Sequence, residues 1–240
     1  MAARFAELDY EDTGMGELTL RRRFDPQLQM EVYEVKLGDE FLMSSLFTVA
    51  EEQLSELALA QIRADKINVL VGGLGLGYTA LAALRDDRVQ TLCVVEALGP
   101  VIRWHEQELL PDTAGLAADP RVRLLQGSFF NAVEAKADAE ARPTYDAILL
   151  DIDHSPAHVL HASHASFYTA AGLSGLKGHL NPEGVFGLWS DDPPDSEFLA
   201  LLDAHFSEAR AEVVSFPNPL TGGVSSNTVY LAQLAEVASQ

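Results

Sequence analysis

The sequence has little cysteine and little positive charge. Its one cysteine, Cys93, lies in an apolar stretch, which excludes disulfides and a cysteine-based zinc site. Only 16 Lys and Arg stand against 36 Asp and Glu, a formal net charge of −20. A surface this acidic repels phosphate backbones, so we expect no nucleic-acid partner, whereas a small polycation would be attracted. The same charge also suits a protein whose acidic surface serves only solubility.

Long apolar runs and several catalytic motifs are missing too. No run reaches the ~18 residues of a membrane-spanning helix, and the first residues lack the apolar core of a signal peptide. We therefore expect a cytoplasmic protein without a membrane role. A serine-nucleophile elbow and a P-loop lysine are absent, so hydrolase and NTPase chemistry lack support. The 240 residues, 48% of them hydrophobic, suit one α/β domain with a small appendage.

A glycine-rich turn follows a short, strongly apolar segment. Residues 67–71 read Ile-Asn-Val-Leu-Val, which predicts a buried parallel strand, and residues 78–84 read as a helix. A strand, a glycine turn and a helix in this order are typical of nucleotide-binding units, because a side chain in the turn would hold the ligand away from the backbone. The candidate cofactor-binding glycines are Gly72, Gly73, Gly75 and Gly77.

An acidic residue follows the next expected strand. Residues 91–95 are followed directly by Glu96, about 20 residues after the turn. A carboxylate at this place would accept the two ribose hydroxyls of a nucleoside. The glycine spacing matches AdoMet-type transferases better than the dinucleotide fingerprint. Glu96 could instead only cap the helix after it. We favour the cofactor interpretation because the glycines and the acid occur together in the required context.

The remaining pattern predicts an α/β fold with two parts. Residues 1–48 alternate like strands and predict a small N-terminal antiparallel β unit, and residues 49–240 predict a doubly wound, mainly parallel sheet. Thr48 and Glu51 suggest a capping box for the helix between the parts. The expected strands are 17–23, 30–35, 40–44, 67–71, 91–95, 122–128, 145–151, 185–189, 211–216 and 227–232. The expected helices are 49–63, 78–84, 99–110, 131–140, 163–180 (interrupted near Gly172) and 194–206, with a turn at 181–184.

Polar residues follow several of these strands. Glu96, Ser128, Asp151 and the segment 190–192 each come directly after a strand end. Since ligands bind beyond the carboxyl ends of parallel strands, we expect these residues to converge on one site.

By these features the chain resembles the class I AdoMet-dependent methyltransferase fold, and within it the polyamine aminopropyltransferases, the spermidine/spermine synthase family. This resemblance implies transfer of an aminopropyl group from decarboxylated AdoMet to a small amine, leaving methylthioadenosine. It also implies a homodimer, with Glu96 holding the ribose. The resemblance rests on the glycine turn, Val95-Glu96, Asp119-Pro120-Arg121-Val122, residues 145–151, Phe167-Tyr168 and residues 180–185.

The chain departs from this family at positions that matter for polyamine chemistry. Gly75 stands where the family carries an aspartate, and Ser128 where an acidic residue follows the third strand. Ser55 replaces a histidine in the linking helix. The family's Asp-Ser-Ser/Thr-Asp-Pro loop reads Asp151-Ile152-Asp153-His154-Ser155-Pro156, so that His154 stands at the position of the general base.

Candidate catalytic residues lie in this altered loop. An amine is protonated at neutral pH, so a carboxylate or an imidazole must take its proton before it can attack a sulfonium. Asp151, Asp153 and His154 provide both types of group. The plainer interpretation is that the aspartates cap and hydrogen-bond the loop and that His154 is solvated.

Two other polar groups have a sharp and a plain interpretation. Asp191 and Asp192 could bind the far ammonium of a polycation, but we favour capping of a helix that begins at Pro194. The spacing of His154, His158, His161 and His164 could suit a metal ion, but we expect no metal site because no cysteine joins them.

The sequence leaves two alternatives to aminopropyl transfer. The altered loop favours an AdoMet-dependent methyltransferase acting on a small molecule. Gly75, Ser128 and the displaced base favour a non-catalytic nucleoside-binding member of the family.

Overall fold

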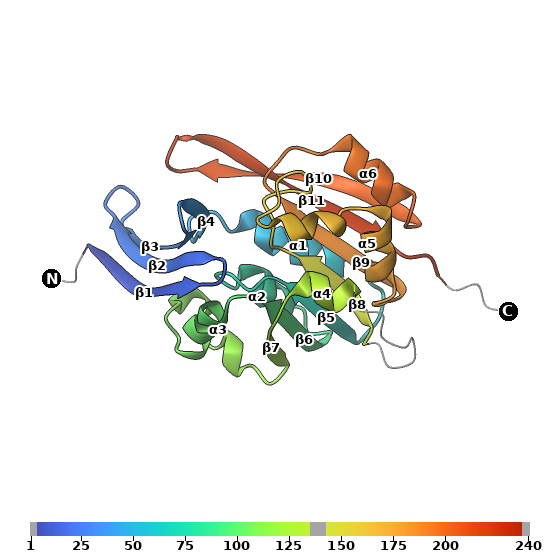
Figure 1. The fold of residues 1–240 in the computed structure, drawn as a ribbon, viewed down its shortest axis with the longest axis horizontal. Helices are drawn as coiled ribbons and strands as arrows, with labels where there is room; N and C mark the ends of the chain where they lie inside the picture. Colours follow the sequence, from blue (N-terminus) through green and yellow to red (C-terminus); the bar gives the residue numbers. More distant parts are fainter. Residues whose placement is uncertain (1–3, 135–142, 237–240) are drawn as a thin grey trace.

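Two β-sheets organise the computed structural model, which describes residues 4–134 and 143–236 (Figure 1). The first sheet is antiparallel, with its four strands in chain order: β1 (Phe5–Thr13), β2 (Gly16–Asp25), β3 (Met30–Leu37) and β4 (Glu40–Ser44). The second sheet contains β5 (Ile67–Gly72), β6 (Val89–Glu96), β7 (Val122–Gln126), β8 (Tyr145–Leu150), β9 (Leu180–Ser190), β10 (Glu208–Asn218) and β11 (Gly223–Gln233). Its spatial order is β10-β11-β9-β8-β5-β6-β7.

The strand order confirms the expected doubly wound fold. Strands β5 to β9 are parallel to one another, and β11 is the antiparallel strand between β9 and β10. The side on which successive strands are added to the sheet changes at β5, which has β6 on one side and β8 on the other. In such a sheet the crevice at the carboxyl ends of the central strands is where ligands bind.

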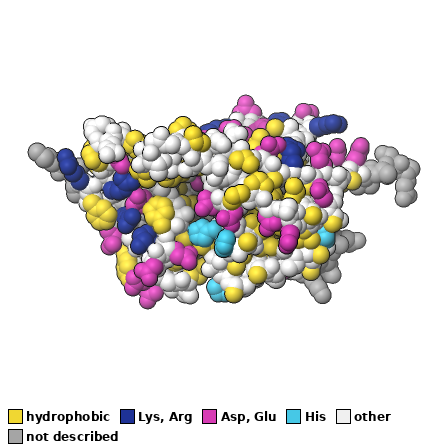
Figure 2. All heavy atoms as spheres, turned by 90° about the horizontal axis from the view of Figure 1, so that it is seen from above, with side chains coloured by type: hydrophobic (Ala, Val, Ile, Leu, Met, Phe, Trp, Pro, Cys, Tyr) yellow, Lys and Arg dark blue, Asp and Glu magenta, His cyan; other side chains and the backbone are white. Residues whose placement is uncertain are grey.

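The basic run of the first sheet forms ion pairs within the chain. Arg21 and Arg23 both donate to the carboxylate of Glu34, at 2.7 and 2.9 Å, and Arg22 lies 3.3 Å from Glu31. Figure 2 shows basic side chains at the end of the molecule formed by the first sheet. These pairs satisfy the arginines across neighbouring strands, without a second copy of the chain.

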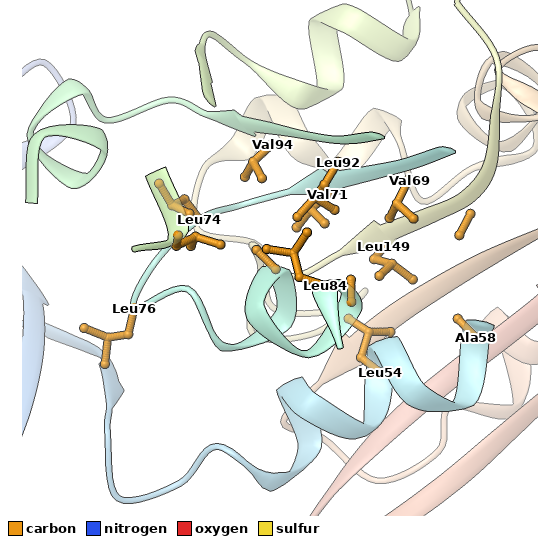
Figure 3. Packing of buried hydrophobic residues seen from close by; sticks show 14 of the residues in the cluster. Leu54, Ala58, Val69, Val71, Leu74, Leu76, Leu84, Leu92, Val94 and Leu149 are labelled. Carbon is orange, nitrogen blue, oxygen red and sulfur yellow. The ribbon is translucent and has the colours of Figure 1, made fainter. Parts of the chain in front are cut away.

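Helices cover both faces of the central sheet. The elements α1 to α3 pack on one face, which Val69 and Val71 of β5 also meet, and α4 to α6 pack on the face of Leu70. Figure 3 shows the first face, with Leu54 of α1 and Leu84 of α2 against Val69 and Leu149. The helices are α1 (Val49–Leu59), α2 (Tyr78–Leu84), α3 (Gly99–Glu106), α4 (Phe129–Glu134), α5 (Ala170–Lys177) and α6 (Ser196–Asp203). Within the described ranges no helix is long and apolar enough to cross a membrane.

The first sheet is packed against the second part of the chain. Leu18, Leu20 and Val35 belong to the same buried cluster as the side chains beneath α1 and α2. The indole N–H of Trp104 on α3 donates to Asp9 Oδ2 at 2.6 Å. In Figure 1 the β10–β11 hairpin extends back toward the first sheet, so the end of the β5–β9 strands is enclosed from two sides.

Three sequence-based expectations about the first half of the chain need correction. The structure adds a strand, β1, whose many acidic residues weaken its strand pattern. The Thr48–Glu51 capping box does not form, because Thr48 Oγ1 instead donates to Glu52 Oε1 at 3.0 Å. The linking helix also ends at Leu59, earlier than expected.

The second half differs in detail from the expected helices. The helix expected over 163–180 is a short 3-10 helix (Ala162–Ser166) followed by α5, whose N-cap is Thr169, so the break precedes Gly172. The turn expected at 181–184 lies within the bounds of β9, as an irregularity: the pairing with β8 passes from Leu180 to Val185, and Glu183 has a φ angle of +60°. The helix α6 begins after Asp195, whose carboxylate accepts the backbone N–H groups of its first turn. Of the helix expected over 131–140, the part after 134 lies outside the described residues.

A buried hydroxyl joins α1 to α2 and provides a test of this packing. Ser55 Oγ donates to the Thr79 carbonyl oxygen at 2.7 Å and is fully buried. We expect Ser55→Ala to lower the free energy of unfolding by about 1 kcal/mol, because the contact is lost in a dry interface. Urea denaturation measures this loss. Ser174→Ala is the control, since its exposed hydroxyl bonds only within α5. Equal losses in the two variants would contradict the assignment.

Candidate functional site

A cavity of about 700 Å³ lies where the two sheets meet. Its floor is the carboxyl edge of the second sheet, one wall is the first sheet, and the β10–β11 hairpin closes another side. Glu96, Ser128, Asp151 and Asp191 all border it, so the polar residues after four separate strands converge as expected.

The glycine turn after β5 forms part of the floor. Gly73, Gly75 and Gly77 have φ angles of +91°, +47° and +91°, in the left-handed region that favours glycine. Gly73 and Gly75 border the cavity. Gly72 instead packs against Phe129, and Gly77 begins α2. The turn therefore carries no side chain of its own at Gly73 and Gly75, as a nucleoside-binding turn requires, although Met43 of the first sheet lies against Gly75.

A side chain from the first sheet lies on the glycine turn. The backbone N–H of Leu76 points to Met43 Sδ at 3.1 Å, and a Cβ atom at Gly75 would come within 2.5 Å of Met43 Cε. On the other side, His105 Nε2 lies 2.9 Å from the Gly75 carbonyl oxygen. Met43 fills the space beside position 75, so a side chain at this position would clash with the first sheet.

Glu96 is buried and held by backbone N–H groups. Its Oε2 accepts from Leu74 at 2.9 Å, and its Oε1 accepts from Leu98 at 2.8 Å. Burial raises the pKa of Glu96, while these backbone hydrogen bonds oppose the shift. The backbone N–H groups of Gly75 and Ala97 oppose the rise as well, and Glu96 borders the cavity. The nearby Ser128 Oγ accepts the Asn131 N–H at 3.2 Å in the first turn of α4.

Two further carboxyl groups, Asp151 and Glu51, border the cavity. Thr79 Oγ1 donates to Asp151 Oδ2 at 2.6 Å, and burial raises the pKa of Asp151 to about 6. Burial, and then the charge of Asp151, raise the pKa of Glu51 to about 8. The charge of Asp151 therefore opposes ionisation of Glu51, and such raised pKa values are common where carboxylates handle a proton. The sequence had suggested only a capping role for Glu51.

A third carboxylate completes this group. Asp191 borders the cavity, accepts from Asn227 Nδ2 at 2.7 Å, and adds to the rise in the pKa of Glu51. Asp192 points elsewhere and pairs with His158 Nδ1 at 2.7 Å. Neither aspartate caps α6, so the capping interpretation is wrong. We refer to Glu51, Asp151 and Asp191 as the carboxylate cluster.

The loop after β8 separates its candidate catalytic residues. Asp153 is buried and accepts from the Leu160 N–H, the Tyr168 hydroxyl and His164 Nδ1, each at 2.8 Å. It holds the loop together and is not among the residues that border the cavity. His154 does border the cavity, partly exposed, with Nε2 3.9 Å from Glu40 Oε2.

The other histidines have separate partners. His161 Nδ1 lies 2.7 Å from Ser163 Oγ, and His164 stacks on Phe130 with ring centroids 4.0 Å apart. In the part of the chain that the structure describes, no three His, Cys, Asp or Glu side chains are placed to hold a metal ion together. Figure 2 shows histidines beside acidic and apolar side chains on one face.

Comparison with known proteins finds distant relatives by sequence. No family model matches the chain. The polyamine aminopropyltransferase of Bacillus mycoides strain KBAB4 is 30% identical over 126 residues, which cover 52% of this chain and 42% of the relative. That of Bacillus cereus strain ATCC 10987 is 29% identical over the same length. The match thus spans less than half the length of these curated relatives.

Solved structures show the same fold. Spermidine synthase from Thermotoga maritima superposes with a TM-score of 0.71 at 17% identity, over 95% of this chain and 72% of that one. Human methyltransferase-like protein 13, in complex with SAH, superposes with a TM-score of 0.54 at 22% identity, over 80% of this chain and 81% of that one. These likenesses confirm the expected methyltransferase-like fold.

The raised pKa of Glu51 predicts a pH-dependent effect on stability. Because the folded state holds the Glu51 proton more tightly than the unfolded state does, ionisation of Glu51 costs stability as pH rises from about 4.5, and the full cost is present above about 8. We expect Glu51→Gln to raise Tm at pH 9 by a few °C and to change it little at pH 4.5, at roughly 2–4 °C per kcal/mol.

Thermal unfolding at the two pH values measures this effect. Glu56→Gln is the matched control, because Glu56 is an exposed glutamate of the same helix. The assignment fails if Glu51→Gln stabilises equally at both pH values, or no more than Glu56→Gln does at pH 9.

Proposed function

We propose that this chain, a distant relative of the polyamine aminopropyltransferase family, transfers an aminopropyl group from decarboxylated AdoMet to a small amine. One observation carries the proposal: the glycine turn, Glu96 and the carboxylate cluster all border the same cavity. A nucleoside-type floor and a proton-accepting group within one chamber are what this transfer needs.

In this proposal the floor holds the adenosine part of the donor. Glu96 accepts the ribose hydroxyls, and Gly73 and Gly75 let the donor approach the backbone. Gly72 and Gly77 act indirectly, by shaping the turn. Ser128, which follows β7 and borders the cavity, lies beside the adenine base of the donor in this proposal.

The proposed chemistry is a single displacement. The amine loses a proton to Asp151, and its lone pair attacks the aminopropyl methylene carbon that is bonded to the sulfonium. The C–S bond breaks and its electron pair passes to sulfur, leaving neutral methylthioadenosine. With a pKa near 6, Asp151 is largely ionised at neutral pH and can receive the proton. His154 at the cavity surface is a second proton acceptor, and Asp153 positions the loop.

Charge favours the decarboxylated donor over AdoMet. The carboxylate of AdoMet would enter a cavity that already holds the carboxylate cluster, and like charges repel strongly where water is scarce. Decarboxylated AdoMet carries only positive charge in that region. The methyltransferase alternative draws support from the likeness to methyltransferase-like protein 13. The non-catalytic alternative draws support from Met43 on the glycine turn.

A homodimer in the cytoplasm belongs to the same proposal. It follows the resemblance to polyamine aminopropyltransferases. An exposed edge strand, β1, with Phe5 and Tyr10 on its surface, is one place where a second copy could add.

Donor binding is the first test of the proposed function. We expect calorimetry to show decarboxylated AdoMet binding at least tenfold more tightly than AdoMet, because the carboxylate of AdoMet meets the cluster. Methylthioadenosine should bind too, since it occupies only the nucleoside floor. Preference for AdoMet would favour methyl transfer, and binding without turnover over an amine panel would favour a non-catalytic role.

Removal of the charge on Asp151 is the second test. We expect Asp151→Asn to lower turnover at least a hundredfold, because the amide cannot take a proton, and to leave methylthioadenosine binding measurable. An asparagine oxygen can still accept from Thr79, so the local contact is kept. Asp203→Asn, an exposed position on α6, is the control. Undiminished turnover in Asp151→Asn would remove Asp151 from the mechanism.

A further inference from the structure

The cavity joins a charged region to an apolar one, and we infer that its acceptor is an amphipathic monoamine rather than a polyamine: one ammonium group on an alkyl or aryl body. This inference rests on the proposed function, since it names the substrate class of the same site. It depends on which walls of the cavity carry charge.

The first sheet contributes an apolar wall, made of Met15, Leu37, Phe41, Leu42 and Met43. Phe41 is 46% exposed and Met15 is 38% exposed, so part of this wall is open to solvent. When a ligand covers exposed apolar side chains in a concave site, binding is favoured because apolar surface is removed from water. Among the described residues of the first sheet, none that borders the cavity is charged.

The carboxylates that border the cavity, which are the carboxylate cluster and Glu96, lie on its other side. The carboxylate cluster combines the start of α1 with the turns after β8 and β9, and its members are close enough for Asp151 and Asp191 both to raise the pKa of Glu51. The hairpin side adds neutral residues, including Asn218 and Asn227. One ammonium is therefore neutralised by the cluster, and among the described residues that border the cavity no carboxylate lies on the apolar wall to pair with a second one. Glu40, whose Oε2 lies 3.9 Å from His154 Nε2, is outside this lining.

These two walls discriminate by physical cost. A ligand with one cationic end places its ammonium in the cluster and its apolar body against the wall. A diamine of the same length would place its second ammonium beside Phe41 and Leu42, and an unpaired charge against apolar surface is unfavourable. The specificity thus comes from rejecting the far charge as well as from covering the wall.

Calorimetry with protein saturated by methylthioadenosine tests this inference. The probes are butylamine, hexylamine and octylamine, each paired with the diamine of equal length. We expect affinity for the alkylamines to rise roughly two- to fourfold per methylene, as for burial of apolar surface. Each should bind at least tenfold more tightly than its diamine. Tighter binding of the diamines, no gain with chain length, or no binding of either series would overturn the inference.

A charge placed on the wall provides the reciprocal test. Phe41→Asp should shift the preference at least tenfold toward the diamine, because the new carboxylate pairs with its second ammonium. Phe5→Asp is the matched control, since Phe5 is exposed on β1 and is not among the residues that border the cavity. An unchanged preference in Phe41→Asp, or the same change in both variants, would overturn the inference.

Turnover is measured separately with decarboxylated AdoMet. Alkylamine binding with the expected preference but without product would count against aminopropyl transfer and leave the substrate class standing. Product formed from diamines alone would support the transfer and overturn the substrate class.

Discussion

Close approach of two backbone segments determines the geometry of this site. A Cβ atom at Gly73 would lie 2.1 Å from the Asp151 carbonyl oxygen, so only glycine lets the end of β5 lie against the end of β8. The Asp151 N–H also donates to the Gly72 carbonyl oxygen at 2.8 Å. This contact places Asp151 beside the glycine turn, at the edge of the cavity.

The first sheet covers one side of this edge, so that a cavity forms there. At an open sheet edge the carboxylate cluster would lie in water, where ionised carboxylates are well solvated and interact weakly. With the first sheet on one side and the β10–β11 hairpin on another, Glu51 and Asp151 lose solvent, and their pKa values rise. The same enclosure brings apolar side chains opposite the charges. The chemical character of the site thus arises between parts of the chain, and no single motif contains it.

This explains which features the sequence could predict. Gly73, Glu96 and Asp151 were predictable because each follows a parallel strand, and parallel strands end at one edge. Glu51 was not, because its importance depends on Asp151, far along the chain, and its local pattern suits a helix cap equally well. Met43 was not predictable either, because its position on the glycine turn depends on how the first sheet packs against the rest of the chain. Asp153 was misleading, since two aspartates in one loop look alike until the fold turns one inward to His164 and Tyr168.

The raised pKa values of Glu51 and Asp151 have a thermodynamic consequence. Near neutral pH the folded protein retains protons that water alone would have removed. Any cation that enters the cluster favours the ionised carboxylates and so expels protons into the solvent. Uptake of a positively charged guest is thereby linked to acidification of the medium, and the measured heat of that uptake carries a contribution from whichever buffer captures what is released.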